Sequence, residues 1–188
     1  MFSLRTSFVL LAALLTITGA APTLENPLND LAARQVCYDS SSSVAFLRAY
    51  NVKQTDHYYT TSVSAMDKAV SKDGYKSQGD AGHVFTSEVV NTSPLYQLYT
   101  AKTTDNFYTT SEEQAEKVVS NGGGWKRQGI AAYVYEDQIC GSIPLYQVYN
   151  PKITDHFYTT DETERNHAID DDGYVDQGIA CYVLPDDD

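Results

Sequence analysis

The pattern of apolar, aromatic and polar residues repeats three times along the chain. A block of alternating residues begins at Ala45, Pro94 and Pro144, and its second copy reads Pro-Leu-Tyr-Gln-Leu-Tyr. A second block follows at a fixed distance in each copy, Asp-His-Tyr-Tyr-Thr-Thr at 56–61, Asp-Asn-Phe-Tyr-Thr-Thr at 105–110 and Asp-His-Phe-Tyr-Thr-Thr at 155–160. Alternation rich in aromatic residues predicts two short strands in every copy.

A helical pattern follows the second block. Met66, Ala69 and Val70 lie at i, i+3 and i+4 and form one narrow apolar stripe, as do the residues at 115, 118 and 119. The third copy keeps this stripe only in part, because it has Arg165 at the first position. Capping-box spacings precede two of these segments and glycines follow all three: Ser111 with Gln114, Asp161 with Glu164, and Gly74, Gly124 and Gly173.

Each copy ends with a third block, in which an aromatic residue follows a glycine and a Gln-Gly pair comes three residues later. A strand rich in apolar residues is predicted at 130–135 and 179–184. The first copy departs from this pattern, since it has Asp80 where the others have isoleucine and His83 where they have tyrosine. The predicted unit is therefore strand, loop, strand, short helix, strand.

Such a unit cannot bury its apolar faces alone, so we expect three units to close around one core. The predicted fold is α+β, mainly β, a compact pseudo-threefold ring within a single domain of residues 35–188. The units span about 44–88, 93–137 and 143–185. A β-trefoil is the alternative, although its units carry no regular helix.

The N-terminal residues have the layout of a secretory signal peptide. A basic start, an apolar run over 8–17 and small residues before Pro22 predict a signal peptide at 1–21. Residues 22–34 are interpreted as a linker or a short pro-segment that is cut after Arg34, and a frayed terminus is the other interpretation. The apolar run is too short to span a membrane, so we expect a secreted, extracellular protein.

The net charge limits the classes of partner, and the cysteine positions limit the disulfide pairing. The net charge of −12 disfavours nucleic acids and anionic lipid surfaces as partners. A secreted protein with three cysteines allows one disulfide. Cys37 and Cys140 both stand just ahead of a unit, whereas Cys181 occupies a slot that holds Gly82 or Ala132 in the other copies. We therefore predict a Cys37–Cys140 disulfide and a buried Cys181 thiol.

The sequence contains one glycosylation sequon, Asn91-Thr92-Ser93, in the connection between the first two units. A connecting segment just before Pro94 should be exposed, so we predict an N-glycan on Asn91.

The motifs Pro-Leu-Tyr-x-x-Tyr, Asp-His-Phe-Tyr-Thr-Thr and Gln-Gly-Ile-Ala-x-Tyr-Val resemble a repeat-domain family of unknown function. The resemblance covers about Val44 to Leu184. Members of that family occur in secreted fungal and bacterial proteins, sometimes beside cell-wall or carbohydrate-active domains. The resemblance implies an extracellular, surface-related role and no assigned reaction. This chain departs from the motif at Asn106, where the other copies have histidine.

Polar residues that recur in threes are typical of a scaffold, and an enzyme needs an asymmetric constellation. The Asp-His pairs at 56–57 and 155–156 could serve acid/base chemistry or form half a metal site. We interpret the aspartates instead as turn residues that bond to their own backbone. We therefore predict no catalytic residue, no metal, no cofactor and a monomeric protein.

The aromatic residue after each glycine is the candidate binding residue. We interpret the conserved tyrosines of the first block, Tyr50, Tyr99 and Tyr149, as packing residues. Loop-to-strand junctions are more exposed, and aromatic rings there, with a side-chain amide nearby, could stack on sugars. The predicted ligand-binding residues are Tyr75, Trp125, Tyr174, Gln78, Gln128 and Gln177.

The leading prediction is a non-enzymatic binding module for cell-wall or surface glycans, which acts through weak contacts at several units. A structural or effector protein with a protein partner is the second hypothesis, and it would show an exposed apolar patch. A hydrolase is the third. It would require one unit to differ from the other two, and Asp80 and His83 make the first unit the place where that would occur.

Overall fold

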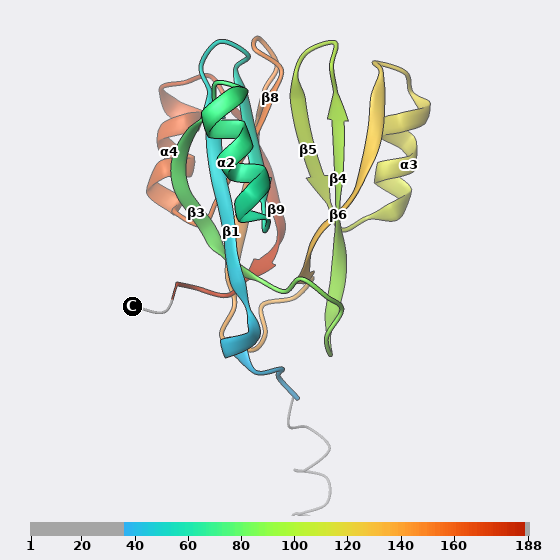
Figure 1. Ribbon diagram of the computed structural model, residues 1–188, viewed down its shortest axis with the longest axis vertical. Coiled ribbons are helices and arrows are strands. Elements are labelled where there is room, and N and C mark those ends of the chain that lie inside the picture. Colours follow the sequence, from blue (N-terminus) through green and yellow to red (C-terminus); the bar gives the residue numbers. More distant parts are fainter. Residues whose placement is uncertain (1–35, 187–188) are drawn as a thin grey trace, which may run out of the picture. The chain divides into compact units, whose positions relative to one another are not determined.

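The computed structural model describes residues 36–186, a mainly β domain with three α-helices in this range (Figure 1). The predicted signal peptide and linker lie outside the described residues. The strands are β1 (Val44–Asn51), β2 (Asp56–Thr60), β3 (Lys76–Val84), β4 (Thr92–Thr100), β5 (Asp105–Thr109), β6 (Trp125–Tyr135), β7 (Ile143–Asn150), β8 (Asp155–Thr159) and β9 (Val175–Val183). The helices are α2 (Val63–Lys72), α3 (Glu112–Ser120) and α4 (Glu162–Asp170), and a 3-10 turn, η1, covers Ser40–Ser42.

Strands group in sets of three that follow the sequence repeat, and we call these sets with their helices units one, two and three. In each unit the first strand is central and pairs antiparallel with the second and third. The pairing register is the same in all units, with Ala49 opposite Tyr58, Leu98 opposite Phe107 and Val148 opposite Phe157. Unit one forms a three-stranded sheet, whereas units two and three join through Tyr135 and Tyr182 into the order β5-β4-β6-β9-β7-β8.

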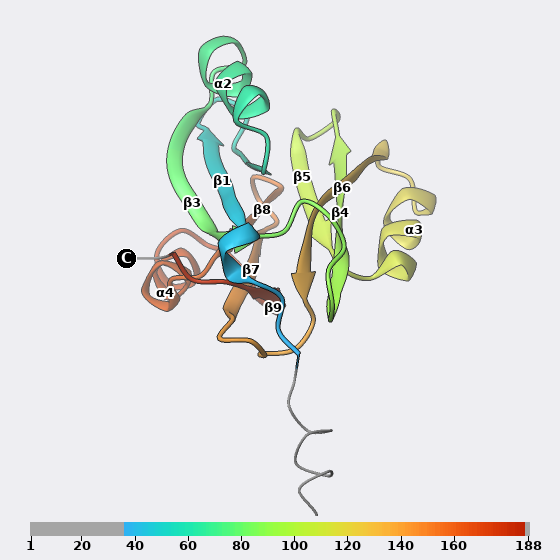
Figure 2. The same ribbon diagram turned by 60° about the horizontal axis from the view of Figure 1, so that its bottom comes forward.

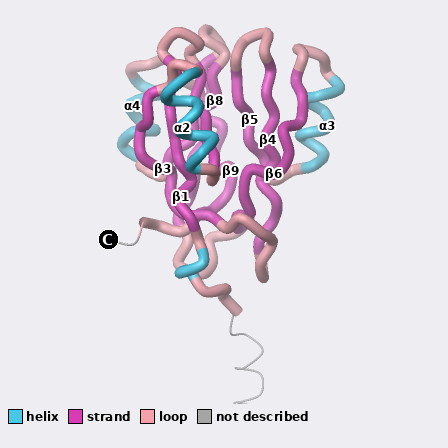
Figure 3. Tube along the Cα trace, viewed as in Figure 1, coloured by secondary structure: helices cyan, strands magenta, loops and turns pink. Residues whose placement is uncertain are grey.

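The three helices lie on the outside of the domain and the strands run through its interior (Figures 2 and 3). The hairpin loops between β1 and β2, β4 and β5, and β7 and β8 meet at the same end (Figure 1). A left-handed threonine closes each loop, with φ of 51° at Thr55, 53° at Thr104 and 55° at Thr154. Positive φ is uncommon for a β-branched residue, so the strain marks a position that the surrounding contacts hold in place.

The helix starts confirm half of the predicted capping pattern. Ser111 Oγ accepts a hydrogen bond from the Gln114 amide at 3.1 Å, as expected for an N-cap. The Gln114 side chain does not bond back to the cap, however, because its Oε1 accepts from Thr109 Oγ1 at 2.6 Å. The stripe is also narrower than predicted, since Ala69 is buried but Val70 is 42% exposed. These short helices therefore attach to their sheets through a few small residues.

The centre of the domain is a cycle of three buried tyrosines, one from each unit. Tyr59 OH donates to Tyr158 O at 2.7 Å, Tyr158 OH to Tyr108 O at 3.0 Å, and Tyr108 OH to Tyr59 O at 2.8 Å. Each hydroxyl also accepts from the backbone amide of the same neighbour, at 2.8–3.0 Å. The rings meet edge to face with all centroid separations at 5.5 Å. Every polar group of the cycle is thereby satisfied without water.

The tyrosines of the first block lie at the edge of the core, where Tyr50 and Tyr149 pack on His57 and His156 with ring centroids 4.4 Å apart. Tyr50, Tyr99 and Tyr149 are half-buried and lie outside the core clusters. The pattern of the central strand explains this, because the alternate side chains Ala49, Leu98 and Val148 are the ones that face inward.

The cysteine predictions are confirmed. Cys37 and Cys140 form a disulfide with Cα atoms 5.5 Å apart, which ties the first described residues to the connection between β6 and β7. Cys181 is a buried free thiol, and burial raises its pKa to about 12. Asn91 is exposed and its amide donates to Val36 O at 3.0 Å, so N-glycosylation there stays a prediction. Within the described residues, no helix is both long and apolar enough to cross a membrane.

Candidate functional site

Two grooves lie at junctions between units. The first groove, between units one and two, has a volume of about 610 Å³. Unit one contributes the helix α2 and the strand β2, and unit two contributes β4, β5 and the start of β6. Its lining is Gln54, Tyr58, Ala65, Lys68, Ala69, Asp73, Tyr75, Gln97, Tyr99, Asn106 and Gln128.

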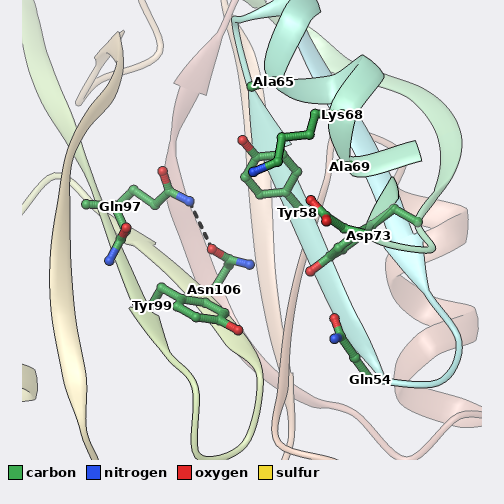
Figure 4. Close-up of a pocket in the computed structure, with 11 residues that line it drawn as sticks. Gln54, Tyr58, Ala65, Lys68, Ala69, Asp73, Gln97, Tyr99 and Asn106 are labelled. Atoms are coloured by element: carbon green, nitrogen blue, oxygen red, sulfur yellow. Dashed lines mark hydrogen bonds between the residues drawn. The ribbon is translucent and has the colours of Figure 1, made fainter. Parts of the chain in front are cut away.

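The first groove combines aromatic rings with side-chain amides. Tyr58 and Tyr99 come from opposite walls and face the same space, with Lys68 and Asp73 at the helix side (Figure 4). Gln97 Nε2 donates to Asn106 Oδ1 at 2.9 Å, which fixes both amides at the base of the groove. Rings that offer a flat apolar face, next to amides that both donate and accept, can bind a neutral polyhydroxylated ligand.

The second groove, between units three and one, is smaller, at about 440 Å³. Its residues are mostly the counterparts of those in the first groove, with Tyr174 for Tyr75, Tyr50 for Tyr99 and Gln78 for Gln128. The full lining is Tyr50, His57, Gln78, Asn150, Ile153, Phe157, Glu164, His167, Ala168, Asp172 and Tyr174.

An ion pair spans the second groove and has no counterpart in the first. Arg48 of β1 binds Glu164 of α4 through both guanidinium nitrogens, at 2.7 and 3.1 Å. At the equivalent positions the first groove has Gln97 and Ala65. The guanidinium also lies 5.5 Å from the Phe157 ring centroid. The bridge therefore fills space that the first groove leaves open.

Buried aspartates form the seam beneath the grooves. Asp56 accepts from the backbone and side-chain amides of Asn106 at 2.9 and 2.8 Å, and from the Tyr75 hydroxyl. Asp105 forms hydrogen bonds with the backbone N and the Nδ1 of His156, at 3.1 and 2.8 Å. Asp155 forms hydrogen bonds with the same two groups of His57, at 2.9 and 2.7 Å.

The predicted role of these aspartates as turn residues that bond to their own backbone is therefore wrong. Each carboxylate reaches the next unit, some fifty or one hundred residues away in sequence, and satisfies a backbone amide there. Their facing oxygens lie within 4.8 Å of one another. Because each carboxylate already accepts hydrogen bonds from its neighbour, we interpret the cluster as a structural seam between units.

The Asp56 carboxyl differs from the other two in having no histidine beside it. Burial, with a further contribution from the charges of Asp155 and Asp105, raises its pKa to about 7, although the hydrogen bonds from Tyr75 and Asn106 oppose this. A neutral amide cannot balance a carboxylate charge as an imidazolium can. Asp56, beside the first groove, is therefore the aspartate of the seam whose side-chain partner from the next unit cannot carry a positive charge.

Four of the six predicted binding residues line the two grooves, where the aromatic residue and the glutamine come from different units, whereas Trp125 and Gln177 line neither groove. Tyr75 lines the first groove together with Gln128 of the neighbouring unit, and Tyr174 lines the second with Gln78. Gln78, Gln128 and Gln177 are exposed.

The three junction aromatics differ in burial. Tyr174 is 8% exposed and donates to Asp155 Oδ2 at 2.5 Å, so its expected exposure is wrong. Tyr75 and Trp125 are half-buried. Trp125 packs against Phe107 and against His156 of unit three, with both centroid separations at 6.3 Å.

Several lining residues were missed from the sequence. Tyr58, Tyr99 and Gln97 belong to strands, where alternation indicates packing, and their outward faces become groove walls only after two units meet. A signal was nevertheless present, because arginine occupies the position of Gln97 in unit one, so the side chain at this position differs between the junctions.

A family model described as a domain of unknown function, DUF5648, matches residues 45–184. No curated protein matches the chain significantly, and neither does any solved structure.

Proposed function

Since the chain belongs to the DUF5648 family, whose function is unknown, we propose from the geometry of its grooves that it is a secreted, non-enzymatic module that binds neutral glycan polymers. The observation that carries the proposal is the first groove, whose lining combines tyrosines from two units with the hydrogen-bonded side-chain amides of Gln97 and Asn106. Ligand sites of this size, with apolar walls and a few oriented polar groups, suit one or two sugar rings.

The net charge of −12 favours uncharged ligands. An acidic polysaccharide would meet a repulsive field, whereas a hexose or N-acetylhexosamine polymer would not. The charged residues of the first groove are one lysine and one aspartate, Lys68 and Asp73, and their opposite charges leave it close to neutral.

The proposal includes the arrangement of the units as a pseudo-threefold ring. The cycle of tyrosine hydrogen bonds and the three equivalent carboxylate contacts support this arrangement, because each unit bonds to the next in the same way. A ring places equivalent junctions between successive units, and at one of them the Arg48–Glu164 ion pair narrows the groove.

A glycan array that includes neutral and acidic polymers tests the function, and Tyr99→Ala tests the site. We expect binding to neutral polymers and its loss in Tyr99→Ala, because the ring forms one wall of the first groove. Tyr38→Ala is the matched control, since Tyr38 is an exposed tyrosine that packs on Phe85 and lines neither groove. An array on which only acidic glycans bind, or equal binding by both variants, would contradict the proposal.

A further inference from the structure

The two residues that break the repeat in unit one meet the C-terminal tail. Asp80 and His83 lie on β3, at positions where units two and three carry isoleucine and tyrosine. Asp186 completes the group, and one potential ligand atom from each of the three residues lies within 4.8 Å of the others. This constellation occurs once, so the repeat itself does not explain it.

Backbone contacts hold the tail in this position. His83 N donates to Leu184 O at 2.8 Å, and Leu184 N donates to His83 O at 2.9 Å. The tail passes so close to β3 that a Cβ on Gly82 would lie 2.6 Å from Val183 Cγ2. Units two and three have alanine and cysteine at this position. Unit one therefore has glycine at this position, and its lack of a side chain leaves room for Val183 and Leu184.

The composition of the Asp80–His83–Asp186 group favours a bound cation. Two carboxylates with one imidazole leave an excess of negative charge at a place that the backbone keeps together. A divalent ion would remove the repulsion between them.

We propose that Asp80, His83 and Asp186 bind a divalent transition-metal ion of the Zn²⁺ class. His83 Nε2 lies 3.3 Å from Asp186 Oδ1. Two ligands that are each about 2.0–2.1 Å from a tetrahedral Zn²⁺ are separated by roughly 3.3 Å, so this pair is already spaced for one ion. An imidazole with two carboxylates suits zinc better than calcium, which takes oxygen ligands.

The site is open to solvent, because the side chains of His83 and Asp186 are 25% and 58% exposed. Water can therefore complete the coordination. The ion would fasten the segment after β9, in unit three, to β3 in unit one. Since binding to the folded state stabilises it, zinc should raise the unfolding temperature.

The test is a zinc titration of the full-length, untagged protein after treatment with EDTA and dialysis, by calorimetry and thermal unfolding. We expect one Zn²⁺ per chain and a higher unfolding temperature. The double variant Asp80→Ile/His83→Tyr has on β3 the isoleucine and tyrosine that units two and three carry at these positions. It should weaken zinc binding by about a hundredfold or more. Asp186→Ala, an exposed tail position, should do the same without affecting folding.

His167→Gln is the matched control. His167 on α4 is exposed and has a carboxylate on each side of its ring, Asp171 at 2.7 Å from Nδ1 and Asp172 at 3.9 Å from Nε2, so the two carboxylates do not share one ring nitrogen as ligands of a single ion. This variant should bind zinc as tightly as the unchanged protein. Absence of zinc binding, or equal binding in the Asp80→Ile/His83→Tyr variant, would overturn the proposal.

Discussion

At the residue scale, one asparagine sets the electrostatics of the seam between units. The positions equivalent to Asn106 are His57 and His156, and each of these imidazoles bonds to an aspartate of the preceding unit. Asn106 offers Asp56 a neutral amide instead. The seam therefore has three carboxylates and only two partners that can carry a positive charge.

Stability should consequently fall as the pH rises through neutrality. The folded pKa of Asp56, about 7, lies above its ordinary value of 3.8, so the folded state keeps a proton that the unfolded state releases. The stability that this proton provides is fully present below pH 4 and is lost as the pH rises through 7. Its size is on the order of 4 kcal/mol at most.

We predict that Asn106→His flattens this dependence, because an imidazolium beside Asp56 favours the charged carboxylate. The measurement is the unfolding free energy by denaturant titration at pH 5 and pH 8. His57→Asn is the converse variant and should steepen the fall, since it removes the partner of Asp155. Identical pH profiles for Asn106→His and the unchanged protein would show that Asp56 does not control the effect.

At the element scale, the equivalent strand–helix junctions of the two grooves differ, because an ion pair crosses the second groove. The Arg48–Glu164 pair joins β1 to α4, and the carboxylate also accepts from Thr159 Oγ1 at 2.5 Å. The first groove has an amide and a methyl group at the equivalent positions. These two side chains are smaller and uncharged, in keeping with the greater volume of the first groove.

We predict that Arg48→Gln with Glu164→Ala gives the second groove the binding property of the first. Both residues are changed together, because removal of one partner would leave the other charge without its counterion in a partly buried site. The stoichiometry of a neutral oligosaccharide, measured by calorimetry, should rise from one to two per chain. Retained cooperative unfolding checks the fold. An unchanged stoichiometry in a folded variant would contradict a blocking role for the ion pair.

At the scale of the whole molecule, the Cys37–Cys140 disulfide closes a loop across 103 residues. Cross-linking so long a segment restricts the unfolded chain, and the chain-entropy model assigns about 4–5 kcal/mol to it. We predict that Cys37→Ala with Cys140→Ala lowers the unfolding free energy by up to this amount but leaves binding in the first groove intact, because neither cysteine lines it.

Cys181→Ala provides the comparison for the cysteine variants. This thiol is buried and unpaired, and the equivalent residue of unit two is alanine, so the loss of stability should be small. Denaturant unfolding of both variants measures the difference. A larger loss for Cys181→Ala than for the double variant would show that core packing, rather than the cross-link, dominates.

Most elements of the fold were predictable from the sequence, because strands and helices follow from local periodicity. The two hairpin strands and the short helix occur in each unit as predicted, whereas the closing strands β6 and β9 begin earlier than predicted, at Trp125 and Val175. The disulfide was also predictable, because Cys37 and Cys140 stand at equivalent points of the repeat whereas Cys181 occupies a cramped core slot. Repetition strengthens the interpretation, since each copy tests the interpretation of the other two.

The sequence by itself determined the three-unit pattern, the strands and helices within it and the cysteine pairing. Only the tertiary structure decided what the polar residues do. Asp56, Asp105 and Asp155 have the local pattern of turn residues, yet their partners lie in other units, and no local period encodes a contact across fifty or one hundred residues. The groove walls and the meeting of Asp80 and His83 with Asp186 arise in the same way, because surfaces between units exist only once the units have packed together.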